Sequence, residues 1–141
     1  MNREKIYCAL FNLVCSVSGF TTVSRRLKPW SEVEASQQPA LFQAQVSENV
    51  VQVTNQPPKW KMEVNLYIYC YSSDPKISPS IQINNLLDAI EDVLKPNGAL
   101  ENQTLGGLVT YCRISGKTQT DEGVLGQQAV VIIPIEILIP N

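Results

Sequence analysis

The clearest periodic pattern lies in the middle of the chain, between Trp60 and Tyr71. Every even-numbered position is apolar, whereas the odd-numbered positions begin with charged and amide side chains and end in Tyr67, Tyr69 and Tyr71. Side chains alternate between the two faces of a strand, so this run predicts a long strand with one face in the core. The tyrosine row has no basic rim, and we therefore favour packing or a subunit interface over a stacking platform for bases or sugars.

Two segments have apolar residues at helical spacing and predict amphipathic helices. The first covers Met1–Val17 and ends before Gly19. The second starts with Ser78 as N-cap and Pro79 at its first position, and it ends within Lys95–Gly98. Serine caps helices well, proline fits the first helical position, and glycine is favoured just past a helix end.

Several shorter runs predict further strands. A polar stretch, residues 31–38, lies between the strand expected at Thr21–Val23 and those expected after Pro39, and it predicts one helical turn. The expected strands are Thr21–Val23, then Ala40–Val46 and Val50–Thr54 joined by a turn at Ser47–Asn49.

The last third of the chain, Thr104–Pro140, predicts a long β-hairpin. Its two β-branched runs, Leu108–Ile114 and Gln128–Ile139, flank a polar connection. Pro134 interrupts the second run and lacks a backbone N–H, so a bulge or an edge position is expected near it.

The polar connection of this hairpin, Ser115–Gln127, contains Lys117, Asp121 and Glu122. Part of it resembles the end of a phosphate-binding loop, but Tyr111 stands where the first glycine of that motif belongs. The acidic pair does not have the spacing of a calcium loop either. We interpret the connection as a mobile contact loop.

Composition places the chain among ordinary globular domains. Its 141 residues, 44% hydrophobic and 17% charged, fit a single domain spanning residues 1–141. The element order predicts an α+β fold, with a mostly antiparallel β-sheet and two α-helices packed on one face. A net charge of −2 does not indicate a sequence-independent DNA binder, and the apolar runs are too short for a membrane span.

One dense basic group occurs, formed by Arg25, Arg26 and Lys28. It suits contact with an acidic neighbouring subunit, contact with phosphate, or simply a solvated edge strand guarded by charge. Trp30, after Pro29, is expected to be half-buried over the core or at an interface.

Catalytic and metal-binding signatures are missing from the sequence. It has no histidine and no Cys-x-x-Cys pair, so we expect no metal and no cofactor. We expect its four cysteines to be buried free thiols: Cys8, Cys15, Cys70 and Cys112. The alternative of a small hydrolase would use Asp88, Glu91 or Asp121 together with Lys117, but no nucleophile motif supports it.

Three stretches together resemble a known family. They are LFQAQ (Leu41–Gln45), PPKWKMEVNLYIY (Pro57–Tyr69) and the closing hairpin (Thr104–Pro140) with its TDEG pattern. In element order and in these residues, nearly the whole chain resembles the tail terminator proteins of long-tailed bacteriophages, relatives of the lambdoid minor tail protein U.

This resemblance implies a structural protein rather than an enzyme. Members of that family form a hexameric ring on the head-proximal end of the tail tube, which stops tube growth and offers a surface for joining the head. The implied partners are further copies of the chain, the tail tube protein and a head-completion or connector protein, with DNA only passing through the lumen. The implied location is the virion, after assembly in the host cytoplasm. A head–tail connector ring is the neighbouring alternative.

A ring of identical subunits requires two different complementary patches on each subunit. The candidates from the sequence are the basic group with Trp30, the tyrosine row and the polar connection of the hairpin. The basic group has a second possible role, which is to line the lumen of the ring.

Overall fold

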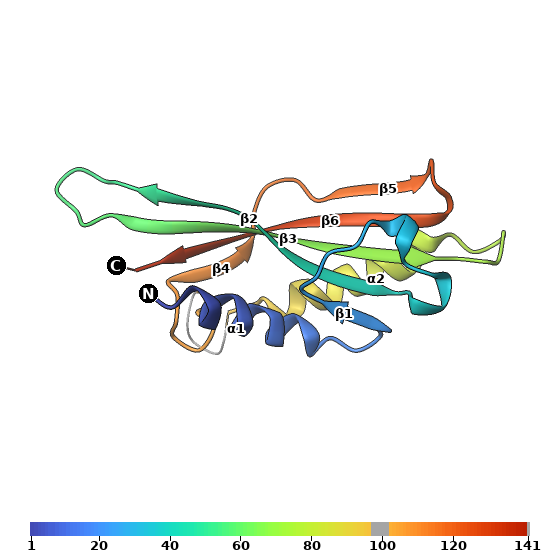
Figure 1. The fold of residues 1–141 in the computed structure, drawn as a ribbon, viewed down its shortest axis with the longest axis horizontal. Helices are drawn as coiled ribbons and strands as arrows, with labels where there is room; N and C mark the ends of the chain where they lie inside the picture. Colours follow the sequence, from blue (N-terminus) through green and yellow to red (C-terminus); the bar gives the residue numbers. More distant parts are fainter. Residues whose placement is uncertain (97–101, 141) are drawn as a thin grey trace.

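The computed structural model describes residues 1–96 and 102–140, which form a sheet with two helices on one face (Figure 1). The predicted α+β class is therefore confirmed. In chain order the elements are α1 (Arg3–Cys15), β1 (Thr22–Ser24), the 3-10 turns η1 (Trp30–Glu32) and η2 (Ala35–Gln37), β2 (Ala40–Val51), β3 (Lys59–Tyr71), α2 (Pro79–Val93), β4 (Tyr111–Ile114), β5 (Gln119–Gly123) and β6 (Gly126–Ile139).

The sheet has six strands and is antiparallel except for one pair. Its order is β1-β2-β3-β6, and β4 and β5 both pair with the outer edge of β6. Among the described strands, only β1 and β2 run parallel. The centre is the β3–β6 pair, which runs without a register break from Trp60–Ile139 to Tyr71–Gln128. This long ladder positions every other element.

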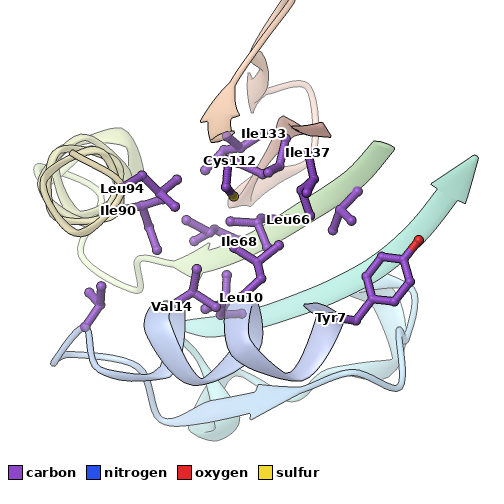
Figure 2. Close-up of a cluster of buried hydrophobic side chains, with 14 of the residues drawn as sticks. Tyr7, Leu10, Val14, Leu66, Ile68, Ile90, Leu94, Cys112, Ile133 and Ile137 are labelled. Carbon is purple, nitrogen blue, oxygen red and sulfur yellow. The ribbon is translucent and has the colours of Figure 1, made fainter. Parts of the chain in front are cut away.

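Both helices pack their apolar stripes on the face predicted to be the core. From β3 the even-numbered residues point to this face, and from β6 the odd-numbered isoleucines and Val131 do so. Figure 2 shows Leu10 and Val14 of α1 and Ile90 of α2 directed at Leu66 and Ile68 of β3. Neither helix has the length and apolarity required to cross a membrane, within the part of the chain that is described.

The opposite face of the sheet is partly covered by the chain itself. Residues 25–38, which include η1 and η2, fold over it and bury a second, smaller cluster. That cluster consists of Val33, Ala40, Phe42 and Tyr69, with Tyr67 and Val130 packed against it. The sheet therefore lies between the helices on one side and an irregular segment on the other.

The prediction of two short strands for residues 40–54 is wrong. β2 is one strand of 12 residues, with a register shift between Gln45 and Ser47 and no turn. Ser47–Asn49 has turn-forming residues, but β3 is long enough to pair with this stretch, from Ser47–Glu63 to Val51–Lys59. Pairing to a long neighbour has overridden the local turn preference.

The connection of the closing hairpin also differs from the prediction. Its middle forms β5, which pairs with β6 from Gln119–Ile132 to Gly123–Gly126. The interpretation as a loop is therefore wrong for residues 119–123. No periodic apolar pattern signals this strand, because it lies at the sheet edge and both faces are largely exposed.

Pro134 lies where the outer neighbour of β6 changes. β4 pairs with β6 up to Ile114–Ile135, and β5 begins at Gln119–Ile132, so Pro134 sits in the gap between them. On the inner side Pro134 stays in register with Asn65 of β3. The expected edge position at Pro134 is confirmed, because the missing N–H falls on the side without a continuous partner strand.

The cysteine prediction is correct for only two of the four residues. Cys70 and Cys112 are buried, whereas Cys8 and Cys15 lie exposed on α1. The helix buries Ile6, Leu10 and Val14, and both exposed thiols fall outside that stripe. At the end of α2, the predicted stop residues Asn97 and Gly98 lie outside the described residues.

The far end of the β2–β3 hairpin forms an arm that projects beyond the rest of the molecule (Figure 1). We define the arm as residues 49–59. Val50 and Val53 are 52% and 49% exposed, and the tip from Asn49 to Pro58 has no charged side chain. The arm is paired only within itself over most of its length, since β6 ends opposite Trp60.

Candidate assembly surface

The three residues of the basic group do not have the same surroundings in the structure. Arg25 forms an ion pair with Glu4 of α1, and its guanidinium also reaches the Oε1 atom of Gln45 at 3.4 Å. Arg25 is therefore used within the chain, where it joins α1 to the β1 edge.

Arg26 and Lys28 remain available at the surface. Both side chains are exposed, and neither makes an ion pair with any described residue. Their backbone is held in place: the Arg26 N–H donates to Ser24 Oγ at 2.9 Å, and the Tyr69 hydroxyl donates to the Lys28 carbonyl at 2.6 Å. They line a hollow beside β1 and β2 that also includes Glu32 and Phe42.

The tyrosine row is mostly packed inside the molecule. Tyr69 is buried, with its ring 5.5 Å from that of Phe42, and Tyr67 is half-buried beside it. Burial, with a smaller effect from Tyr67, raises the pKa of Tyr69 to about 12. Only Tyr71 is exposed, at 38%, and its hydroxyl bonds to Gln127. Of the sequence interpretations, packing beneath a covering segment is confirmed for Tyr67 and Tyr69.

Trp30 and the acidic pair of the closing hairpin come together in a groove. It has a volume of about 540 Å³ and lies over the β5–β6 end of the sheet. Trp30, 39% exposed, forms one wall and β5 forms the other, with the side chain of Asp121 on this face of the sheet and that of Glu122, which pairs with Ala129, on the opposite face. Lys117 is exposed and does not line this groove.

The carboxylate of Asp121 has an oxygen atom that is not paired within the described part of the chain. Its Oδ1 atom is buried and has no hydrogen-bond partner among the described residues. Asp121 and Glu122 also form no ion pair with any residue in this set. An apolar and aromatic groove with the free carboxylate of Asp121 suits a cationic side chain, which an indole ring and a carboxylate both attract.

A buried glutamine pair fixes the segment that carries Trp30. Gln38 and Gln128 exchange two amide hydrogen bonds of 2.8 and 2.9 Å, and Gln128 also donates to the Cys70 and Ala129 carbonyls. Sequence reasoning missed this pair. The two residues are 90 positions apart, and no local pattern marks either of them as buried.

The two edges of the sheet end on the same row of residues. Across the strands, Val23 pairs with Leu41, Leu41 with Ile68, Ile68 with Val131, and Val131 with Thr120. β1 and β5 therefore terminate one transverse row at opposite edges. Arg26 and Lys28 lie two and four residues after the end of β1 at Ser24, and Asp121 and Glu122 follow Thr120 within β5.

The residues proposed for a hydrolase are not brought together. Asp88 and Glu91 lie on the outer side of α2, on the helical face of the sheet, whereas Asp121 lines the groove on the opposite face. Within residues 1–96 and 102–140, no group of three or more metal-ligating side chains converges.

Comparisons with known proteins show similarity in fold and not in sequence. No protein family and no curated protein matches the sequence. Among solved structures, the chain is similar to a chain from the virion of a native gene transfer agent particle, with a TM-score of 0.60, 7% identity and coverage of 99% of this chain and 97% of that one. A second solved chain, with no stated function, matches at a TM-score of 0.51 and 13% identity over 100% and 97% of the two chains.

Proposed function

We propose that this protein is a structural subunit of a phage-type virion, and specifically a tail terminator that forms a ring on the head-proximal end of the tail tube. The observation that carries the proposal is the likeness to a chain of a gene transfer agent virion, which extends over 99% of this chain and 97% of that one. A match over both full lengths supports a shared subunit architecture. The sequence resemblance to tail terminators supports the more specific role.

The surface of the molecule suits self-assembly better than chemistry. A closed ring requires two different patches on each subunit. Exposed cations follow β1, and free carboxylates with Trp30 lie at β5. In the proposed assembly the ring contacts the tail tube protein on one side and a head-completion or connector protein on the other.

This role sets the location and the relation to DNA. The ring belongs to the virion and is assembled in the host cytoplasm, and DNA only passes through its lumen. With a net charge of −2, the subunit has no general attraction for phosphate. No membrane, cofactor or catalytic step enters the proposal.

The direct test is the assembly state of the purified protein. We expect light scattering after size exclusion to give a mass near six subunits, and negative-stain images to show six-fold rings with an open lumen. A strict monomer at high concentration and low salt, with hydrolytic activity that disappears in Asp121→Ala, would instead support the enzyme alternative.

A head–tail connector ring is the second candidate, because a chain of a virion particle can belong to either place in the assembly. Phage particles produced without the protein distinguish the two. A terminator predicts tubes of excessive and variable length. A connector predicts tails of normal length that fail to join heads.

A further inference from the structure

We infer that successive copies of this chain bind head to tail through the two edges of the sheet, with Arg26 and Lys28 of one copy seated against Asp121 and Glu122 of the next. The inference rests on the proposed ring and names the contact that would build it. The partner is a second copy of the same chain.

The shared row places the two edge strands at the same level of the sheet. β1 and β5 end the same transverse row, so a neighbour placed beside the β5 edge presents β1 at the same level. β1 runs in the direction of β2 and β6, and β5 runs opposite to them. In head-to-tail repetition, β5 and the neighbour's β1 are therefore antiparallel, which is a direction that allows direct strand pairing.

Neither edge strand has a second strand as a partner within residues 1–96 and 102–140. In the described part of the chain, β1 pairs only with β2, and β5 pairs only with β6. Unpaired edges are templates for another strand, and proteins usually protect them unless they are used. A ring in which each edge meets the next subunit leaves neither edge open.

Charge specifies which edge meets which. At the β1 edge, Arg25 is paired with Glu4, and the hollow beside it contains two exposed cations and one carboxylate, Glu32; the β5 edge presents Asp121 and Glu122. Like edges would oppose like charges, so β1-to-β1 and β5-to-β5 pairs are disfavoured. This favours the heterologous arrangement that closes into rings.

The groove at the β5 edge offers more than charge. Asp121 lies on the same sheet face as Val130, and the hollow of Arg26 and Lys28 includes Phe42 on that same face. A cation entering the groove meets a free carboxylate and the indole of Trp30. Both interactions strengthen when water is excluded from the contact.

The test is a pair of charge-reversed variants that are complementary to each other. In variant A, Asp121→Lys and Glu122→Lys reverse the β5 edge. In variant B, Arg26→Glu and Lys28→Glu reverse the β1 edge. We expect each variant alone to need about tenfold or more higher protein concentration to assemble, as measured by sedimentation velocity.

Mixing A and B gives the decisive result. Each A–B junction then pairs opposite charges on both sides, so we expect assembly to return as alternating rings, which an even-numbered ring permits. A single chain that carries all four substitutions is expected to assemble by itself. As a control of matched charge change, Asp88→Lys with Glu91→Lys on the outer side of α2 leaves assembly unchanged.

The outcomes separate this inference from the proposed function. Rings that persist in A and in B, or an A–B mixture that stays apart while the control assembles, overturn the edge contact and leave the ring proposal standing. A wild-type chain that never assembles overturns both. Circular dichroism checks the fold of each variant, and Glu122→Lys alone, at an exposed position, provides the milder version of A.

Discussion

At the scale of single residues, the buried amide pair of Gln38 and Gln128 holds the covering segment to the sheet. Gln38→Ala removes both mutual hydrogen bonds and leaves the Gln128 Oε1 atom buried without its donor. We expect the free energy of unfolding to fall by about 1–3 kcal/mol, because an unpaired buried polar group keeps its desolvation cost. Urea unfolding measures the change. Gln37→Ala, at the exposed neighbouring position, is the control, and equal effects of the two variants would contradict the interpretation.

Glu136 makes stability depend on pH. Burial raises the pKa of this carboxyl, but Lys61 at 3.3 Å, a hydrogen bond from Ser115, and Arg113 at 3.5 Å together outweigh it, and the pKa lies below its ordinary value of 4.5. Because the pKa of Glu136 is lower in the folded state, its ionised carboxylate stabilises the fold at pH values above the unfolded-state pKa. This contribution is lost as the pH falls through the folded-state pKa. We expect Glu136→Gln to cost about 0.5–1 kcal/mol at about pH 7 and almost nothing at about pH 3. A cost that is the same at both pH values would contradict this.

At the scale of elements, the sequence predicts the helices and strands that have a periodic apolar pattern. It does not predict strands that form because a neighbouring strand pairs with them. β3 and α2 follow from the alternation of Trp60–Tyr71 and from the Ser78–Pro79 start. The sequence pattern divides β2 in two because turn residues interrupt it, and it does not reveal β5 because an exposed edge strand needs no apolar face. In both cases a neighbouring strand supplies hydrogen bonds that no local pattern reports.

Shortening the arm tests whether it contributes to the stability of the rest of the subunit. Replacing Gln52–Pro58 with Asn-Gly joins Val51 to Lys59, which already face each other in the ladder, through a favourable two-residue turn. We expect the melting temperature of the subunit to change by less than about 3 °C, because β6 ends opposite Trp60 and the removed residues add no pairing to the central sheet. Thermal denaturation followed by circular dichroism measures it. A cooperative loss of stability would show that the arm supports the core.

At the scale of the whole molecule, the candidate surface was predictable in its parts and not in its arrangement. The sequence identifies Trp30, Asp121 and Glu122 as candidates, yet 90 residues lie between Trp30 and Asp121 in the chain. The tyrosine row was visible as a pattern, but the segment that covers Tyr67 and Tyr69 lies outside it. Which candidates share a surface depends on the register of the central sheet, and that register is set by contacts distant in sequence.

The dependence of assembly on salt distinguishes between two surfaces of the molecule. The sheet edges would associate through exposed charges, whereas the arm would associate through Val50 and Val53, which are 52% and 49% exposed. Raising NaCl from about 50 mM to about 500 mM shortens the screening length from about 14 Å to about 4 Å and weakens contacts between charges. Sulfate salts instead strengthen apolar association.

We expect analytical ultracentrifugation to show wild-type assembly that weakens with NaCl, and the Asn-Gly arm variant to show the same dependence. Assembly that is insensitive to NaCl, strengthens in sulfate and disappears with the arm would locate the contact on the β2–β3 hairpin, because only the valines would then explain it.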